Sequence, residues 1–341
     1  MSEATGPGPA RWKIGLILSA LLGIALAVWL VLYYGLSEVG DAFLAAGWRG
    51  LAAIIFVNAV SVMFCALAWR VLLVKPHAGA TRACLWARWL RDGIGNVLPI
   101  FPAAGEVVAA RELTLTGVPA GIAGASTIVD LTTEMVSQLL FTLLGLVLLI
   151  VERPGSGHIW PVAGGLVAAA VMLGGFMIAQ RKGLLKFLES LPERLGFSQP
   201  WAKLPEAASI HTGVQAIYDH PRRVAASIAI HFAAWIAGAA ETWTALWFMG
   251  HPLSFTAIIT IESLVFALRT LAFAVPWAAG VQEGGYVMFG ALFGLPPGMA
   301  LALSLLKRAR ELITGVPALL LWQSKEIGKF VKGLWRSGER Q

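Results

Sequence analysis

Long apolar runs separated by short polar segments dominate the pattern of this chain. Each run reaches the roughly 20 residues that a helix needs to cross a bilayer. Such runs lie at about 14–34, 51–74, 118–150, 159–180, 223–249 and 298–323. The pattern predicts an all-α polytopic membrane protein with about six transmembrane helices.

A segment interrupted by Pro and Gly is present twice, at a constant spacing. The stretch 98–126 matches the stretch 275–303, without a gap, when 177 is added to each residue number, and this shift places Glu106 on Glu283. The Pro and Gly positions that we expect to shape these segments are Pro99, Gly105, Pro276 and Gly280. A duplicated, interrupted segment that carries a carboxylate is typical of a transporter's substrate site.

Basic residues are unevenly distributed among the segments that connect the apolar runs. They gather in 75–92, in 181–223 and in the tail beyond residue 324, and they are sparse in the other connections. The positive-inside rule places these three segments and the N-terminus in the cytoplasm. The run at 223–249 then ends on the outer side of the membrane, and the run at 298–323 begins there. The apolar stretch 255–275 between them therefore cannot span the membrane, and must return to the side from which it enters.

We therefore predict a re-entrant hairpin near 255–293 that enters from outside, and a matching hairpin near 80–114 that enters from inside. Two such copies of opposite orientation form an inverted-topology repeat. Both termini would be inside, in a multi-pass protein of the bacterial cytoplasmic (inner) membrane. The predicted parts are a disordered cytoplasmic N-terminus (1–13), a signal-anchor helix with an outer loop (14–50), a first repeat (51–180), a cytoplasmic amphipathic loop (181–222), a second repeat (223–323) and a basic cytoplasmic tail (324–341).

Composition narrows the function further. A hydrophobic fraction of 57% and a charged fraction of 13% place the chain outside the soluble class. The net charge of +7 does not indicate nucleic acid, because the basic residues lie in connecting segments, where they meet anionic lipid heads. The two cysteines and six scattered histidines lack metal-ligand spacing, so we predict no metal and no cofactor. Membrane lipids are the predicted partners.

Two of the predicted membrane helices carry matching polar stripes. The steps of three, four and three residues place each stripe on one helical face. The first stripe consists of Thr127, Asp130, Glu134 and Ser137. The second, its partner under the shift of 177, consists of Ser304, Lys307, Glu311 and Thr314.

Charges at mid-membrane cost about 2.5–3.5 kcal/mol each on insertion scales, so chains keep them where they face a partner or a wet site. One interpretation is a central amphiphilic site, in which cations meet an anionic lipid head and carboxylates relay protons or bind cationic groups. Its cations would be Lys307, Arg308 and Arg310, and its carboxylates Glu106, Asp130, Glu134, Glu283 and Glu311. The other interpretation is a set of structural ion pairs, such as Asp130 with Lys307.

The remaining intramembrane polar residues are expected to have structural roles or to pair. Arg91 is expected near the membrane interface, where a long side chain can reach the polar head groups. Glu262 and Arg269, seven positions apart, share a helical face and could pair with each other or with Glu241. His231 is expected to be a hydrogen-bonded structural histidine.

Two motifs resemble the signatures of a known family. GNVLPIFPAAGEVVAAREL, at 95–113, resembles the G-x-x-x-P…G-E-x-x-R signature of the flippase-like membrane family named after the transmembrane region of lysylphosphatidylglycerol synthases. VPWAAGVQE, at 275–283, resembles its second signature, P-G-G-x-G-x-x-E. The resemblance covers roughly 14–323, and the chain is also similar to the hopanoid-biosynthesis-associated subgroup.

The resemblance implies a lipid-handling role, of which aminoacyl-phosphatidylglycerol translocation is the best known. It carries over Glu106, Arg111 and Glu283 as functional positions. The chain departs from the pattern because Arg111 follows Glu106 by five positions rather than three, and because Ala278 and Ala279 stand where glycines are usual. No aminoacyl-transferase domain is expected after residue 323.

The leading prediction is a lipid translocator without enzymatic activity, coupled to protons or to nothing. One alternative is an intramembrane lipid-modifying enzyme that uses two of these carboxylates as acid and base. Another is a non-catalytic scaffold for enzymes of lipid biosynthesis, which would then be its protein partners.

Overall fold

The computed structural model describes residues 36–74, 79–97, 104–152, 205–272 and 278–338, together with Trp29, Leu32, Gly164, Val167 and Val275. The spans predicted at 14–34 and 159–180 lie almost entirely outside the described residues. Pro99 and Pro276 also lie outside them.

The described residues form nine helices and no strand. The helices are α2 (Leu36–Leu72), α3 (Ala80–Val97), α4 (Ala104–Thr114), α5 (Ala120–Glu152), α8 (Pro205–Tyr218), α9 (Pro221–Phe248), α10 (Phe255–Leu271), α11 (Val281–Ala291) and α12 (Pro297–Gly338). Helix α2 begins inside the predicted outer loop, and it is broken at Gly47, where φ is 58° and ψ is −174°. Part of the amphipathic loop predicted over 181–222 forms α8, which packs against α5.

Three of the described helices are long and apolar enough to cross a membrane, namely those over Phe43–Leu72, Ala120–Glu152 and Pro221–Phe248. They coincide with three of the predicted spans and establish the chain as a helical membrane protein. The span predicted at 298–323 is helical, as part of α12, but is not among the three. Four charged side chains within 307–311 lower the hydropathy there.

The sequence duplication extends to the ends of the helices. Adding 177 to the bounds of α4 gives those of α11 (104 + 177 = 281 and 114 + 177 = 291), and the first residues of α5 and α12 are related in the same way (120 + 177 = 297). Gly117 and Gly294, also 177 apart, have φ of 94° and 78°. A side chain would strain this left-handed backbone, so glycine ends α4 and α11 in the same manner.

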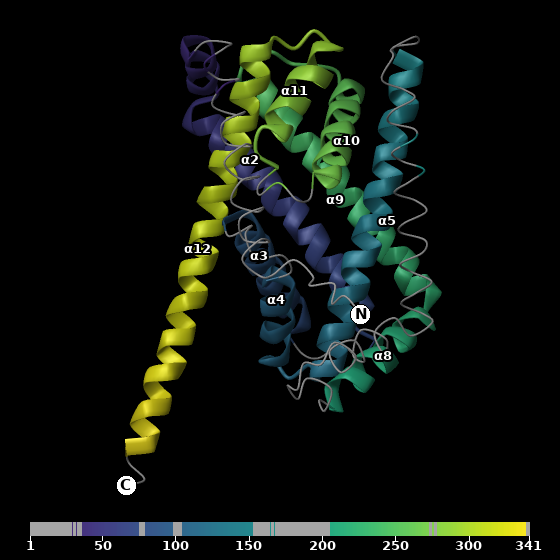
Figure 1. Cartoon of the computed structure of the whole chain (residues 1–341), viewed down its shortest axis with the longest axis vertical. Helices are drawn as coiled ribbons and strands as arrows, with labels where there is room; N and C mark the ends of the chain where they lie inside the picture. Colours follow the sequence, from purple (N-terminus) through teal and green to yellow (C-terminus); the bar gives the residue numbers. More distant parts are fainter. Residues whose placement is uncertain are drawn as a thin grey trace, which may run out of the picture.

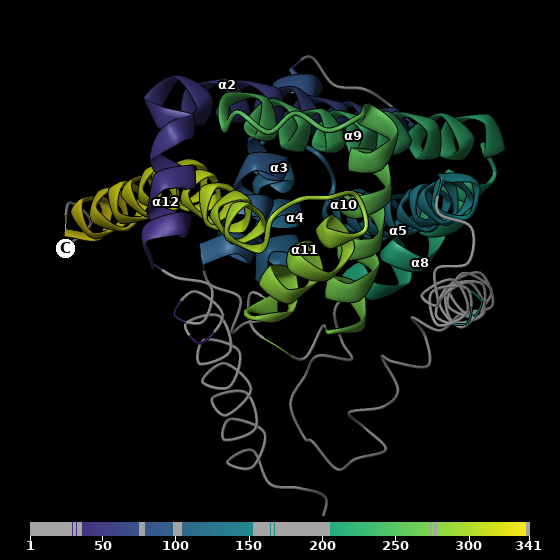
Figure 2. The ribbon, with the colours of Figure 1, turned by 90° about the horizontal axis from the view of Figure 1, so that it is seen from above.

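The two copies lie at opposite ends of the molecule. Helices α2 and α9 pack along each other as one layer, with α3, α4, α10 and α11 behind it (Figure 2). The pair α3–α4 lies at the end where α5 begins, and the pair α10–α11 at the end where α12 begins (Figure 1). Helices α5 and α12 run in opposite directions. The ranges of the two pairs match those of the predicted hairpins, whose entry into a membrane from opposite sides stays a prediction.

Candidate functional site

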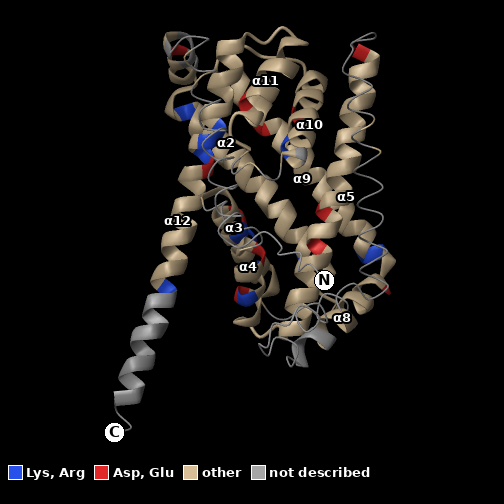
Figure 3. Cartoon of the chain, in the orientation of Figure 1, with Lys and Arg blue, Asp and Glu red and all other residues tan. Residues whose placement is uncertain are grey.

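Charged residues gather at the level of α3 and α4 and again near α10, α11 and the first part of α12 (Figure 3), and their largely buried side chains form two clusters. The α3–α5 cluster consists of Arg88, Arg91, Asp92, Glu106, Asp130, Glu134 and His231. The α9–α12 cluster consists of Glu241, Glu262, Glu283, Lys307, Arg308, Arg310 and Glu311.

Two buried arginines of α3 hold the carboxylates of α5 in the α3–α5 cluster. Both Nη atoms of Arg88 donate to Glu134, at 2.9 and 2.7 Å. Arg91 donates from Nη1 to Asp130 and from Nη2 to Glu134, at 2.9 Å each. The arginines are three residues apart and the carboxylates four apart, so each pair lies on one helical face. Such forked, charge-assisted bonds fix the relative position of α3 and α5.

The accessible edge of this cluster is formed by Glu106 and Asp92. Glu106 Oε1 lies 3.4 Å from Arg91 Nε, and Asp92 Oδ2 accepts a hydrogen bond of 2.9 Å from Arg88 Nε. Their side chains are 30% and 28% exposed, whereas the side chain of Asp130 is fully buried. The cluster therefore connects a buried carboxylate to the protein surface.

His231 of α9 closes the buried side of the cluster. Its Nε2 lies 3.0 Å from Oδ1 of Asp130, and one turn earlier Ser227 shares a hydrogen bond of 2.9 Å with Thr133 of α5. Its Nδ1 is buried and has no hydrogen-bond partner among the described residues. Asp130 thus lies between a guanidinium and an imidazole.

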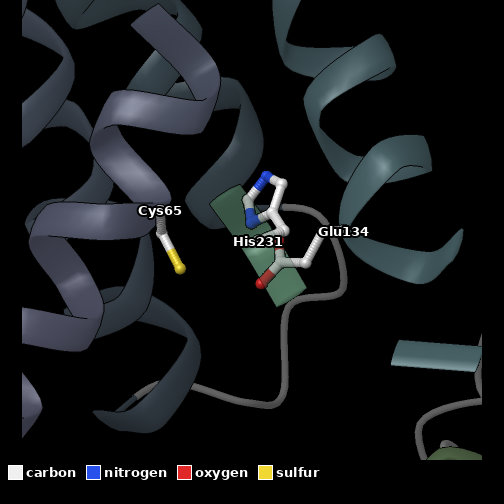
Figure 4. Close-up of side chains that lie close together, drawn as sticks. All are labelled: Cys65, Glu134 and His231. Atoms are coloured by element: carbon white, nitrogen blue, oxygen red, sulfur yellow. The ribbon is translucent and has the colours of Figure 1, made fainter. Parts of the chain in front are cut away.

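Cys65, Glu134 and His231 point toward one another, with their sulfur, oxygen and nitrogen ligand atoms within 4.8 Å (Figure 4). These atom types bind transition metals. Here, however, both oxygens of Glu134 already accept hydrogen bonds from guanidinium groups. Two fixed positive charges beside the carboxylate oppose a divalent cation, so we keep Glu134 and His231 in the α3–α5 cluster and assign no metal centre to the three residues.

Glu262 of α10 is the buried centre of the α9–α12 cluster. Lys307 Nζ donates to both of its oxygens, at 2.9 Å each, and to Thr242 Oγ1 at 2.8 Å. The hydroxyls of Thr242 and Tyr286 each donate to Glu262 Oε1 at 2.6 Å. These donors satisfy a carboxylate that is fully buried.

Arg310 is the second buried cation of this cluster. Its Nε donates to Glu241 Oε1 on α9, at 3.1 Å. The other oxygen of Glu241 accepts a bond of 3.4 Å from Asn58 on α2. The pair therefore ties α12 to both helices of the α2–α9 layer.

Glu283 lies at the start of α11, as Glu106 does in α4. Its Oε2 accepts from the backbone N–H of Gly280 at 2.7 Å, and its Oε1 accepts from Ser304 at 3.1 Å. Arg308 lies 3.7 Å from Glu283 and donates to Glu311 at 3.2 Å. The side chain of Arg308 is 19% exposed, the most of the three cations of this cluster.

Aromatic side chains separate the two clusters along α9. His231 and Glu241 are ten residues apart on this helix, or about 15 Å at 1.5 Å per residue. Between them, Trp235 stacks on Phe141 at 6.0 Å and meets Phe266 edge-on at 4.8 Å, and its Nε1 donates to Ser137. His231 and Glu241 are therefore closer together than the roughly 30 Å thickness of a bilayer's hydrocarbon core, with aromatic side chains between them.

The sequence profile of the lysylphosphatidylglycerol synthase TM region matches residues 16–318. The chain belongs to this family. Membership indicates a membrane lipid-related function and confirms the resemblance derived from the two motifs. None of the curated proteins and none of the solved structures compared with the chain matches it.

Eight of the nine charged residues proposed from the sequence fall in the two clusters of this family member. Glu106, Asp130 and Glu134 lie in the α3–α5 cluster, and Glu283, Lys307, Arg308, Arg310 and Glu311 lie in the α9–α12 cluster. Arg111 is exposed in the last turn of α4. Gly105 lies against the backbone of Arg91, and Gly280 precedes α11.

The expected partners differ from those in the structure. Asp130 and Lys307 do not pair, because α5 and α12 run in opposite directions and their equivalent stripes meet different helices. Arg91 is buried in the cluster and pairs with Asp130 and Glu134, and its expected place near the membrane interface stays a prediction. Glu262 pairs with Lys307, and not with Arg269 or Glu241.

Sequence reasoning missed Arg88, which lies in a segment read as a basic connection. The available signal was the spacing of Arg88 and Arg91, which places two cations on one face of a helix. Thr242 and Tyr286 carried no such signal, because a single hydroxyl in an apolar run shows no preferred partner.

Proposed function

We propose that this protein translocates an amphiphilic lipid across the bacterial cytoplasmic membrane. The lipid would be a phospholipid, an aminoacyl-phospholipid, a hopanoid or a polyprenyl lipid. The observation that carries the proposal is the pair of charged clusters inside a membrane protein of a lipid-related family, at equivalent places in duplicated helices. A polar head needs such groups in hydrocarbon, while the lipid tails remain in the bilayer.

The partly exposed charges are the proposed contacts for the head group. Glu106 and Asp92 offer carboxylates at the α3–α5 cluster, and Arg308 offers a guanidinium at the α9–α12 cluster. A lipid head can replace a protein partner at these positions with little desolvation, since each is already partly hydrated. The fully buried pairs, such as Glu262 with Lys307, would instead support the site.

Opposite placement of the two pairs supports alternating access. The pairs α3–α4 and α10–α11 would enter the membrane from opposite sides, as a hairpin each, and rocking of one copy against the other would open each cluster in turn. The layer around Trp235 would keep the two ends from opening together. Lipid translocation would be driven by proton movement across the membrane or would have no coupled energy source.

The test uses purified protein in phosphatidylcholine vesicles that contain a trace of NBD-labelled phosphatidylglycerol, with dithionite added outside. Translocation makes more than about half of the probe accessible, since inner-leaflet probe then reaches the outer leaflet. Glu106→Gln and Arg308→Gln are expected to slow the rate about tenfold or more, because a charge-assisted bond is worth about 1.5–3 kcal/mol.

Arg82→Gln is the matched control, since Arg82 is exposed on α3 outside both clusters. Thermal unfolding of each variant in detergent shows whether it remains folded. Wild-type rates in both folded variants would remove the head-group assignment. Conversion of the probe to a new lipid species would favour the enzyme instead.

A further inference from the structure

We propose that His231 and Asp130 form the proton-binding site that couples lipid translocation to proton movement. This inference rests on the proposed function, and it assigns a role to a histidine that neither the family motifs nor the charged stripes include. The arriving proton would bind Nδ1 of His231 and leave from the same atom.

The hydrogen bonds define the atom that would accept the proton. The Asp130 carboxylate, which also accepts from Arg91, has no hydrogen to donate, so we assign Nε2 of His231 as the donor and a lone pair to Nδ1 of the neutral ring. Nδ1 is buried and has no hydrogen-bond partner among the described residues. Uptake of a proton converts the ring to a cation directly beside the Asp130 carboxylate, which stabilises it.

The charge balance of the α3–α5 cluster favours one more positive charge. The cluster contains four carboxylates, of Asp92, Glu106, Asp130 and Glu134, and two guanidinium groups, of Arg88 and Arg91. With a neutral His231 it has two more negative than positive groups (4 − 2 = 2). The excess is carried by the partly exposed Glu106 and Asp92, and a protonated His231 would reduce the net negative charge of the cluster.

The titratable and charged groups nearest His231 come from α5 and α2, and the arginines of α3 pair with the same α5 carboxylates. Asp130 and Glu134 face His231 from α5, and the neutral thiol of Cys65 faces it from α2. On α4, Glu106 connects Arg91 with the accessible edge of the cluster. Glu106 and Asp92, whose side chains are 30% and 28% exposed, are the part of the cluster nearest the protein surface.

The second copy has neither residue of the His231–Asp130 pair at the equivalent positions. The shift of 177 places Lys307 at the position of Asp130, and it places Ile54 of α2 at the position of His231. The α9–α12 cluster thus has a lysine bonded to Glu262 where the α3–α5 cluster has a carboxylate bonded to a histidine. A difference of this kind between the two copies suits a transporter in which one end binds the driving ion.

The first experiment measures NBD-phosphatidylglycerol translocation in the same vesicles between about pH 5.5 and 8, a range in which only histidine titrates at its ordinary pKa. The wild-type rate is expected to change severalfold over this range and to respond to a pH difference across the membrane. His231→Gln is expected to make the rate independent of both. His211→Gln is the matched control, because His211 is a buried histidine on α8 whose Nδ1 likewise lacks a partner.

The second experiment does not depend on translocation. Nitrogen NMR of ¹⁵N-histidine-labelled protein in lipid nanodiscs, with the His231 signal identified by its loss in His231→Gln, reports the charge of the ring. The inference expects the charge of the ring to change together with the translocation rate across the same range of pH. A ring that stays neutral throughout, or a His231→Gln variant with the wild-type pH profile, would overturn the inference and leave the proposed function standing. A wild-type protein that moves no probe at any pH would overturn the proposed function instead.

Discussion

At the residue scale, stability depends on how completely each buried charge is paired. Lys307 Nζ donates to three oxygen atoms within 2.9 Å, two of them on Glu262. Glu262 is fully buried, so its negative charge has no access to solvent. Removal of one partner from such a pair is far more costly than removal of both charges, because a single buried charge remains uncompensated.

Lys307→Met is therefore expected to lower the free energy of unfolding by about 3–5 kcal/mol. The double variant Lys307→Met/Glu262→Gln should recover most of this loss, since a neutral amide oxygen can still accept hydrogen bonds from Thr242 and Tyr286. Unfolding in detergent, followed by tryptophan fluorescence, measures both. Equal losses in the single and double variants would mean that the ion pair is not the source of the cost.

At the element scale, α3 and α4 approach each other through a glycine. A Cβ at Gly105 would lie 2.7 Å from the carbonyl oxygen of Arg91, closer than any side chain tolerates. This contact brings the first turn of α4, with Glu106, against the part of α3 that carries Arg91. The sequence motif marked Gly105 as structural, but only the packing shows which backbone it touches.

Gly105→Ala is expected to destabilise the protein by about 1–3 kcal/mol, because the added methyl group pushes α4 away from α3. It should also slow lipid translocation, since Glu106 moves with α4. Gly95→Ala, in the same helix as Arg91, is the control, because no atom lies within 4 Å of its Cβ position. Thermal midpoints in detergent compare the two, and equal midpoints would contradict the proposed close approach.

At the scale of the whole molecule, the arrangement of the two copies decides how the protein works. The helix bounds repeat with a shift of 177, and α5 and α12 run in opposite directions. If the membrane plane is perpendicular to α5 and α12, the C-terminal ends of α4 and α11 face opposite sides of the membrane. Thr114 and Ala291, which end these helices, are equivalent positions under the shift (114 + 177 = 291).

Single cysteines at Thr114 and Ala291 test this orientation in a chain from which Cys65 and Cys84 have been removed. In intact cells, a membrane-impermeant thiol reagent is expected to label Ala291→Cys from outside. It should label Thr114→Cys only after the cytoplasmic side is opened. Labelling of both positions from the same side would show that the copies are parallel and would remove the basis for alternating access.

The sequence by itself determined the properties that depend on neighbouring residues. Three of the six apolar runs predicted to cross a membrane coincide with described helices able to do so, and the repeated register predicted the duplicated elements around Glu106 and Glu283. Gly117 and Gly294 end equivalent helices because their backbone conformation excludes side chains. Hydropathy and backbone sterics act over a few residues, so they can be read directly from the chain.

The tertiary structure alone decided which charges meet. Asp130 bonds Arg91 and His231, 39 positions before it and 101 after it, while its equivalent, Lys307, bonds Glu262. Matching stripes acquire different partners because α5 and α12 run in opposite directions and face different helices. A charged side chain in an apolar run indicates that it needs a hydrogen-bonding or oppositely charged partner. Which residue is that partner depends on the helices that the fold brings next to it.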